Sequence, residues 1–258
     1  MNKREMSGRI AAFFDLDGTL IAEPSVEWRF FWNLRERQAI PNGNYLRWLA
    51  RAVWLAPRGI EMMRHANKMY LRGVRASDGE SPNYGQPKMA APRFFPEGVN
   101  QVAWHARQGH AIVLVSGTLA PLAQEMALAL TVRLAIRGIG ASVTVCATRL
   151  EENDGRWTGR IVGDAMFGEA KGRAVRRLGK EEGFELARCY AYGDSASDRA
   201  MLEAVGRPCV VNPLGEMEKL ARKREWVVLA WTGQPKLASS AQTAQRRDAA
   251  VLRPGESA

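Results

Sequence analysis

The sequence predicts an α/β protein: a Rossmann-like three-layer sandwich around a mostly parallel sheet, with a small helical cap inserted after the first strand. Three observations lead to this prediction. From residue 97 to residue 229, short apolar runs alternate with amphipathic stretches, which is the pattern of βα units. Between residues 21 and 95, helical spacing replaces that alternation. Several apolar runs end in acidic, hydroxyl-bearing or glycine-containing segments, at the sheet edge where open α/β folds bind ligands.

The first strand and the acidic segment after it carry the strongest signal in the chain. Residues 11–14 are apolar and run into Asp15-Leu16-Asp17-Gly18-Thr19, so a buried strand is expected to end there. Residues two apart point to the same side of a strand, and we expect Asp15 and Asp17 to leave its carboxyl end together. Their repulsion calls for a cation or a shared proton. The alternative interpretation is an Asp-Gly turn that only ends the strand.

The other elements of the core follow from the same alternation of apolar and amphipathic segments. Strands are predicted at residues 111–115, 143–147, 189–192, 208–211 and 226–229. Helices are predicted at residues 96–108, 120–130, 168–182, 197–205 and 215–224. Asn153-Asp154-Gly155-Arg156 has the composition of a hairpin turn between arms at 149–151 and 157–159. Residues 1–20 and 96–232 are therefore expected to form the Rossmann-like core.

Residues 21–95 are predicted to form the helical cap. Apolar residues such as Trp28, Phe31 and Trp32 recur there at helical spacing. Residues 77–92 are rich in Ser, Asp, Gly and Pro, which is typical of a linker that returns the chain to the core. Residues 233–258 are polar and lose periodicity, so a disordered tail is expected.

Composition places the chain among ordinary globular proteins. Its 258 residues are 46% hydrophobic and 25% charged, and no apolar run approaches the length of a membrane span. The N-terminus lacks a signal-type apolar stretch, and the three scattered cysteines are expected to be reduced, so we predict a cytoplasmic protein. The three histidines are dispersed as well, which does not suggest a zinc site.

The net charge of +10 is unevenly distributed. Residues 21–75 contain ten Lys or Arg and four Glu. A basic surface attracts polyanions, anionic membranes and small anionic substrates alike. Charge alone therefore does not identify a partner.

Three further segments fall after predicted strands or at a helix start. Ser116-Gly117-Thr118 offers a hydroxyl and backbone N–H groups that suit a phosphate-sized anion, although Ser-Gly turns are also common loops. Lys171 lies in the first turn of a predicted helix, where the helix dipole disfavours a cation, so it has either a partner there or full hydration. Asp194 and Asp198 add two carboxylates, for which helix capping is the alternative.

Taken together, four carboxylates, a hydroxyl and a lysine at one sheet edge predict a site for a hard cation and a phosphate. Magnesium prefers oxygen ligands and often shares its shell with substrate phosphate. We therefore expect Mg²⁺ as the cofactor.

On these residues the chain resembles the haloacid dehalogenase superfamily, in its phosphoserine-phosphatase-like branch (subfamily IB). Asp15-Leu16-Asp17-Gly18-Thr19 resembles the first motif of that family and Ser116-Gly117-Thr118 the second. Lys171 resembles the third, and Gly193-Asp194-Ser195-Ala196-Ser197-Asp198 the fourth. The order of the motifs matches, and the helical insert stands where this branch carries its cap.

The resemblance implies a phosphatase that acts on a small phosphomonoester through an aspartyl-phosphate. Asp15 would be the nucleophile and Asp17 the acid and base. Ser116, Gly117 and Lys171 would bind the phosphate. Mg²⁺ would be held by the Asp15 carboxylate, the Asp17 carbonyl and Asp194, with Asp198 as a direct or outer partner.

The resemblance to phosphoserine phosphatases themselves is weaker. Pro24 stands where those enzymes carry a glutamate that reads the substrate amine, and Gly18 where they usually have serine. The segment 77–92 also looks less structured than expected. The physiological substrate and the oligomeric state stay open.

Three other functions compete with this prediction. The insert combines Trp28, Phe30, Phe31, Trp32, Trp48 and Trp54 with Arg29, Arg35, Arg37, Arg47 and Arg51. Such a unit can lie in a lipid interface and serve a lipid-like phosphate, but a soluble cap with aromatics in its own core and arginines in water is the favoured interpretation. A phosphotransferase would use the same intermediate. A nucleic-acid binder is not expected, because no recognition motif is present.

Overall fold

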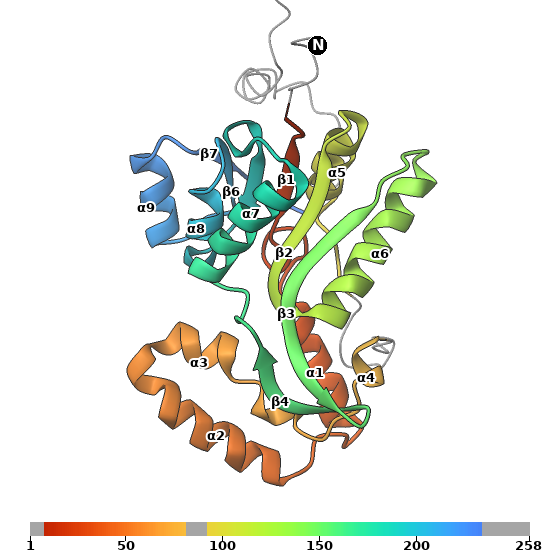
Figure 1. Ribbon diagram of the computed structural model, residues 1–258, viewed down its shortest axis with the longest axis vertical. Helices are drawn as coiled ribbons and strands as arrows, with labels where there is room; N and C mark the ends of the chain where they lie inside the picture. The colour runs from red at the N-terminus through yellow and green to blue at the C-terminus, as the bar shows by residue number, and fades with distance from the viewer. Residues whose placement is uncertain (1–7, 81–91, 234–258) are drawn as a thin grey trace, which may run out of the picture.

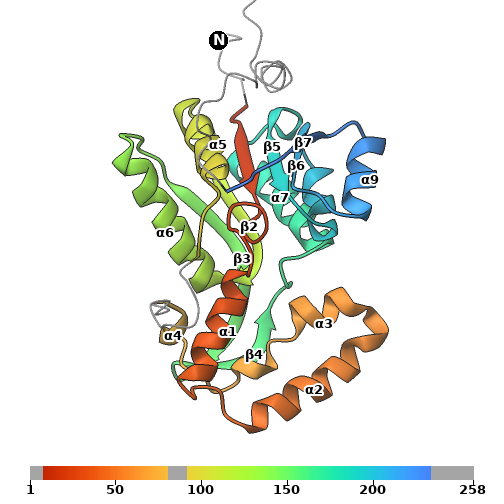
Figure 2. The same ribbon diagram turned by 180° about the vertical axis from the view of Figure 1, so that it is seen from behind.

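The computed structural model describes residues 8–80 and 92–233 and has the predicted α/β fold (Figures 1 and 2). Its seven-stranded sheet has the order β4-β3-β2-β1-β5-β6-β7. The strands are β1 (Ala11–Phe14), β2 (Ala111–Leu119), β3 (Val143–Asn153), β4 (Arg156–Val162), β5 (Tyr190–Gly193), β6 (Arg207–Val211) and β7 (Val227–Leu229). Neighbouring strands are parallel except β3 and β4, which are antiparallel.

Strand β1 lies at the centre of the core because all four of its residues are apolar and buried. Ala12 and Phe14 pack into one apolar cluster with α5 (Pro96–Arg107) and α6 (Ala120–Ile136). Ala11 and Phe13 pack into a second cluster on the other face. That cluster includes residues of α7 (Glu169–Glu182), α8 (Arg199–Leu202) and α9 (Glu216–Lys223). The alternation of side chains along β1 thus produces the three layers.

Helices are the regular elements of the described segment between β1 and α5, and turns and irregular chain join them. The segment contains α1 (Val26–Glu36), α2 (Gly43–Leu55), α3 (Ile60–Ala66) and α4 (Ser77–Glu80), with 3₁₀ turns at Ala56–Arg58 and Met69–Leu71. Figure 1 shows α2 and α3 at the lower left, beside the end of β4 that leads back to the core. The backbone of Arg75 forms an isolated antiparallel β-bridge with that of Arg156 in the β3–β4 hairpin. The Gly73 N–H donates a hydrogen bond to the Trp157 carbonyl at 2.7 Å.

Residues 77–80 were expected to begin a linker and instead form the short helix α4. Gly79 of this helix packs directly on the Trp157 ring: a Cβ at Gly79 would lie 2.6 Å from that ring. The rest of the predicted linker, residues 81–91, and residues 234–258 of the predicted tail lie outside the described residues.

Several boundaries differ from the prediction. Strand β2 does not end at residue 115 but continues through Ser116-Gly117-Thr118 to Leu119, because β3 keeps pairing with it across a bulge between Ser116 and Leu119. The β3–β4 hairpin is longer than expected, with its turn at Asp154-Gly155 (φ 49° and 71°). The helix predicted at 197–205 is a 3₁₀ turn at Ala196–Asp198 followed by the short α8.

The insert does not place all its aromatics in a core of its own. Phe30 is buried, but Trp28, Trp48 and Trp54 are exposed, and Arg29 is buried instead of hydrated. The Arg29 Nε donates to the Pro24 carbonyl at 2.9 Å. The prediction that the aromatics pack in a core of the insert and that its arginines lie in water is therefore wrong for these four side chains.

His105 lies in the core of the α5 face and is fully buried. Its ring nitrogens are 2.8 Å from His110 Nδ1 and 2.9 Å from the Tyr192 hydroxyl. Burial, together with the neighbouring His110, lowers the pKa of His105 to about 3, so the ring is neutral. Within residues 8–80 and 92–233, no helix combines the length and the hydropathy that crossing a bilayer requires.

Candidate active site

The turn after β1 carries Asp15 to the carboxyl edge of the sheet. The Asp15 N–H donates to the Tyr192 carbonyl at 2.9 Å, which prolongs the pairing of β1 with β5. The chain then turns so that Leu20 and Ile21 N–H both donate to the Leu16 carbonyl. Gly18 has φ +85°, and a Cβ there would lie 2.4 Å from Oδ2 of Asp194. Both the positive φ and the close approach of Asp194 require glycine at position 18 of this chain. Serine, the residue expected there by resemblance to phosphoserine phosphatases, would not fit.

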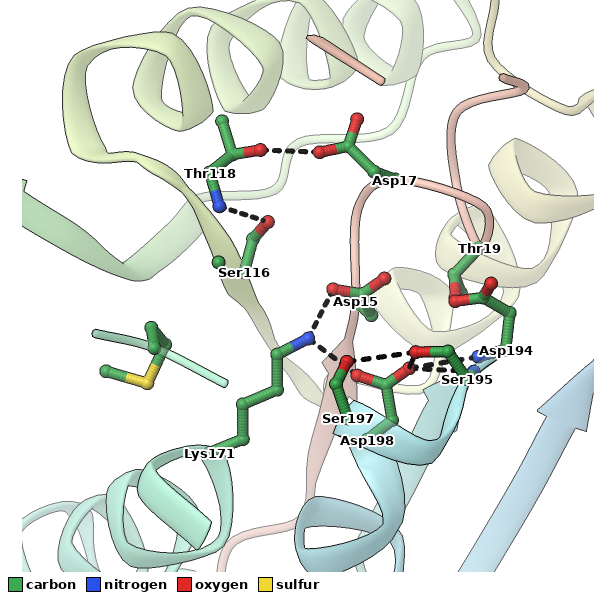
Figure 3. A network of polar contacts seen from close by, with 12 residues as sticks. Asp15, Asp17, Thr19, Ser116, Thr118, Lys171, Asp194, Ser195, Ser197 and Asp198 are labelled. Atoms are coloured by element: carbon green, nitrogen blue, oxygen red, sulfur yellow. Dashed lines mark hydrogen bonds and ion pairs between the residues drawn. The ribbon is translucent and has the colours of Figure 1, made fainter. Parts of the chain in front are cut away.

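Lys171 projects from the first turn of α7 into the same edge (Figure 3). Its ammonium donates to Oδ1 of Asp15 at 2.5 Å and to Oδ1 of Asp198 at 2.6 Å, and the residue is only 2% exposed. Burial opposes its charge, but the Asp15 and Asp198 carboxylates outweigh burial and raise the pKa of Lys171 well above its usual range. These two carboxylates are the partners that compensate for its position in the first turn.

Asp198 organises the loop that follows β5. Its Oδ2 accepts hydrogen bonds from the N–H groups of Asp194 and Ser195, both at 3.1 Å, and from the Ser195 hydroxyl at 3.2 Å. Asp198 is the third residue of a capping box whose N-cap is Ser195, and it makes no side-chain cap bond to α8, so its side chain does not act as the N-cap considered as the alternative. Oδ1 is the atom that contacts Lys171. Asp198 thus anchors both the loop and the lysine.

Asp194 completes a cluster of three carboxylates. Ligand oxygens of Asp15, Asp194 and Asp198 all lie within 4.8 Å of one another. Burial, then the Asp198 carboxylate, raises the pKa of Asp15 to about 7 despite Lys171. Burial, then the Asp15 and Asp198 carboxylates, raises the pKa of Asp194 to about 8. One ammonium does not balance three carboxylates, and the donor set consists of hard oxygens, so the cluster fits Mg²⁺.

The Asp17 carboxylate turns toward β2 instead of joining that cluster (Figure 3). Its Oδ2 accepts the Thr118 hydroxyl at 2.5 Å, and its Oδ1 accepts the Val26 N–H at 2.7 Å. Burial raises the pKa of Asp17, and the hydrogen bonds from Thr118 and Val26 oppose the rise. The site thus contains two neighbouring aspartates in different environments, which is the arrangement that separates nucleophilic from acid–base roles.

The second segment, Ser116-Gly117-Thr118, lies opposite Lys171 on the bulged end of β2. Ser116 is buried, and its Oγ accepts the Thr118 N–H at 3.2 Å. The Gly117 carbonyl accepts the Thr148 hydroxyl of β3 at 2.9 Å, which holds the bulge in place. The structure therefore brings Asp15, Ser116 and Lys171 to one edge, with Asp17 and Asp194 beside them.

The structure adds site residues that the sequence did not indicate. A Cβ at Gly117 would lie 3.3 Å from Nδ1 of His65, so this α3 histidine closes over the bulge. The His65 ring stacks on Phe167 at 5.0 Å. Thr118 was predicted only as part of the turn, and its bond to Asp17 is new. Glycine at position 117 was the only sequence signal that another segment packs closely on this strand. It does not indicate that the segment is α3 or that the residue is His65.

A buried ion pair borders the site at the start of α1. The Glu27 carboxylate accepts two hydrogen bonds from the Lys68 ammonium, at 2.5 and 2.6 Å, and one from the Tyr70 hydroxyl at 2.7 Å. Lys68 is 2% exposed. The carboxylate of Glu27 is therefore already neutralised from within the chain.

A cavity of about 1060 Å³ opens beside the site, between the α2–α3 segment, β4 and the start of α7. Ala170 in its wall precedes Lys171, and Phe167 in its wall carries the His65 ring. Apolar side chains such as Met62 and Met69 line part of it. Its charged walls are Arg47, Arg51, Arg72, Arg160, Arg173, Asp164 and Glu169. The cavity is therefore basic as well as apolar.

Comparison with known proteins identifies the family of this chain. The model of the haloacid dehalogenase-like hydrolases matches residues 12–203. A probable phosphatase of Mycobacterium tuberculosis is 33% identical over 229 residues, which are 87% of this chain and 76% of that protein. The phosphoserine phosphatase SerB1 of the same organism is 29% identical over 227 residues, 84% of this chain and 70% of its own.

Solved structures agree on the fold. A protein of unknown function from Bordetella pertussis Tohama I is 27% identical, with a TM-score of 0.62, and the alignment covers 86% of this chain and 99% of that one. A phosphoserine phosphatase, solved as a phospho-aspartyl intermediate analogue, is 16% identical with a TM-score of 0.56 and covers 86% of this chain and 93% of its own.

Proposed function

The chain belongs to the haloacid dehalogenase-like hydrolases and is a phosphoric monoester hydrolase, and from this premise we propose a Mg²⁺-dependent phosphatase that hydrolyses a small phosphomonoester through a phosphorylated Asp15. One observation carries the proposal. The Lys171 ammonium lies between the Asp15 and Asp198 carboxylates, with Asp194 close by, at the edge of the sheet where α/β folds bind ligands.

Asp15 attacks the phosphorus atom in the first half of the reaction. A bond forms between an Asp15 oxygen and phosphorus while the bond from phosphorus to the leaving oxygen breaks. Asp17 donates its proton to that oxygen, and its raised pKa suits this role. Ser116, the Gly117 N–H and Lys171 hold the phosphoryl oxygens, on which negative charge is spread in the transition state.

Water attacks the phosphorylated Asp15 in the second half. Asp17, now a carboxylate, accepts the proton of that water, and Asp15 is restored as inorganic phosphate leaves. Bound Mg²⁺, held by the carboxylates of Asp15 and Asp194 and the Asp17 carbonyl, would supply Lewis-acid charge that lets a carboxylate approach an anionic phosphate. The bonds of Asp198 to Lys171 and to the loop suit it to orient these groups from behind.

We assign substrate selection to the cavity beside the site. The charged groups in and near this cavity disfavour phosphoserine as the substrate. Glu27 lies near the site, but its carboxylate is paired with Lys68 and Tyr70 and is therefore not free for a substrate amine. Pro24 offers no charge. The arginines of the cavity instead favour a leaving group that carries a second anionic group, and its volume admits a molecule larger than inorganic phosphate.

The direct test is hydrolysis of p-nitrophenyl phosphate by the purified protein, followed by a panel of phosphometabolites. Turnover is expected with Mg²⁺, and we expect EDTA to abolish it and added Mg²⁺ to restore it. A purified, folded protein that turns over no phosphomonoester would contradict the proposal. Turnover that survives EDTA would contradict the metal dependence alone.

Metal binding is also expected to change stability in a pH-dependent way. Because the pKa values of Asp15 and Asp194 rise to about 7 and about 8, the metal-free folded state holds more protons than the unfolded state between about pH 4 and 8. Its stability should therefore fall as pH rises through this window. Mg²⁺ competes with those protons, so the gain in Tm on adding it should be larger at pH 8 than at pH 5. Equal gains in differential scanning fluorimetry would refute this linkage.

The variant Thr118→Val removes the hydroxyl bond to Asp17 while nearly preserving shape. We expect kcat to fall about tenfold, the cost of one hydrogen bond to a charged group. The pKa of Asp17 should rise because the bond from Thr118 lowers it, so the alkaline limb of the pH–rate profile should move to higher pH. Thr158→Val, at an exposed hydroxyl of β4, is the matched control. An unshifted pH profile would remove Thr118 from the mechanism.

A further inference from the structure

Helix α2 carries large apolar side chains that the rest of the described chain leaves exposed. Six large apolar side chains of this helix are exposed: Tyr45 (38%), Leu46 (73%), Leu49 (55%), Val53 (67%), Trp48 (42%) and Trp54 (52%). Helical spacing places Tyr45, Leu46, Leu49 and Val53 on one side, and we call these four the outer face of α2. Only Asn44 and Leu55 of this helix are buried. Contiguous exposed apolar patches mark interaction sites, whereas isolated exposed residues do not.

Polar contacts, instead of an apolar core, hold α2 on the rest of the chain. The Asn44 side-chain amide donates to the carbonyls of Tyr70 and Arg72, at 3.1 and 2.6 Å. The Asn67 side-chain amide donates to the Trp48 carbonyl at 2.8 Å. The helix is thus fixed from its inner side, and its outer face stays available.

The inner side of α2 is basic. Arg47 and Arg51 line the cavity, and the Arg51 guanidinium stacks on the Trp54 ring at 4.1 Å. The helix has no acidic residue, and residues 21–75 contain ten Lys or Arg against four Glu. Apolar and aromatic residues on one side and arginines on the other are the composition of a helix that lies in a membrane interface. Arginine side chains of such a helix reach back to the headgroups.

The position of α2 allows such contact. Both views show it at one end of the long axis, with no described element beyond it (Figures 1 and 2). A flat surface can therefore reach the outer face without meeting the sheet. The arginine-lined cavity lies on the other side of the same helix.

We propose that the outer face of α2 docks this protein on an anionic phospholipid bilayer. The charge of the segment selects anionic headgroups, and the apolar side chains enter the boundary between headgroups and acyl chains. A second copy of the chain would match the apolar face but would bring the same positive charge against itself. Docking of this kind does not depend on the catalytic chemistry.

Cosedimentation of the full-length protein with vesicles tests this proposal. We expect binding to mixed phosphatidylcholine and phosphatidylglycerol vesicles, and little binding to phosphatidylcholine alone. The double variant Leu46→Glu/Leu49→Glu should lose binding at least about tenfold, because it puts charge in the apolar boundary. Its p-nitrophenyl phosphate turnover should not change, since neither residue lines the cavity.

Matched controls come from α6, where Leu128 and Ile136 are exposed by 64% and 81%. Leu128→Glu/Ile136→Glu should bind vesicles like the wild type, and so should Asp15→Asn. The proposal is overturned if the wild type stays in the supernatant with anionic vesicles, or if the α6 variant loses binding as the α2 variant does. It is also overturned if the α2 variant only converts a dimer to a monomer in analytical ultracentrifugation while vesicle binding persists.

Discussion

Replacing Asp15 by Asn is expected to abolish phosphomonoester turnover, with a loss of at least about 10⁴-fold, because removal of a catalytic nucleophile typically costs this much or more. Asparagine keeps the shape of aspartate and leaves Lys171 paired with Asp198. An amide oxygen, however, does not form the phosphorylated intermediate. Steady-state turnover of p-nitrophenyl phosphate, with saturating Mg²⁺, measures the loss.

The same variant should not be unstable. In the metal-free protein, Asn at position 15 removes one of three crowded carboxylates, so its Tm at pH 8 should equal or exceed that of the wild type. Asp154→Asn, at the exposed hairpin turn, is the matched control and should keep full activity. A folded Asp15→Asn variant with more than about a hundredth of wild-type turnover would show that another group is the nucleophile, because knock-outs of true nucleophiles leave far less.

Replacing Lys171 by Met is expected to lower both activity and stability. Loss of one preorganised donor to the transferred phosphoryl group costs on the order of 10² or more in rate. The substitution also leaves the buried carboxylates of Asp15 and Asp198 without their cation, and breaking a buried pair costs about 3–5 kcal/mol of unfolding free energy. The drop in Tm should be on the order of 10 °C for a domain of this size.

Two comparisons separate the effects of Lys171→Met. Thermal unfolding should be followed at pH 8, because protonation of Asp15 and Asp194 at lower pH relieves part of the repulsion. Lys180→Met, on the exposed side of the same helix, should change neither property. Adding Asp198→Asn should recover part of the lost stability and none of the activity. If Lys171→Met melts like the wild type at pH 8, the ion pairs contribute nothing measurable.

The sequence alone determined the order of the core elements, the α/β class and the position of the acidic segment after β1. These are local properties. Apolar runs, helical spacing and turn residues act over a few neighbours, so they can be read without knowing what packs where. Asp15 and Asp194 could likewise be identified, because parallel strands bring their carboxyl ends to a common edge. Lys171 could be identified because the first turn of a helix disfavours a cation.

The tertiary structure decided what depends on contact between distant segments. Pairing with β3 keeps Ser116-Gly117-Thr118 in a bulged strand, and residues 77–80 form a helix that packs on the Trp157 ring. The approach of His65 to Gly117 and the exposure of the outer face of α2 depend on how the insert folds over the core. Contacts between segments far apart in the sequence are properties of the packed chain, and no local pattern of residues specifies them.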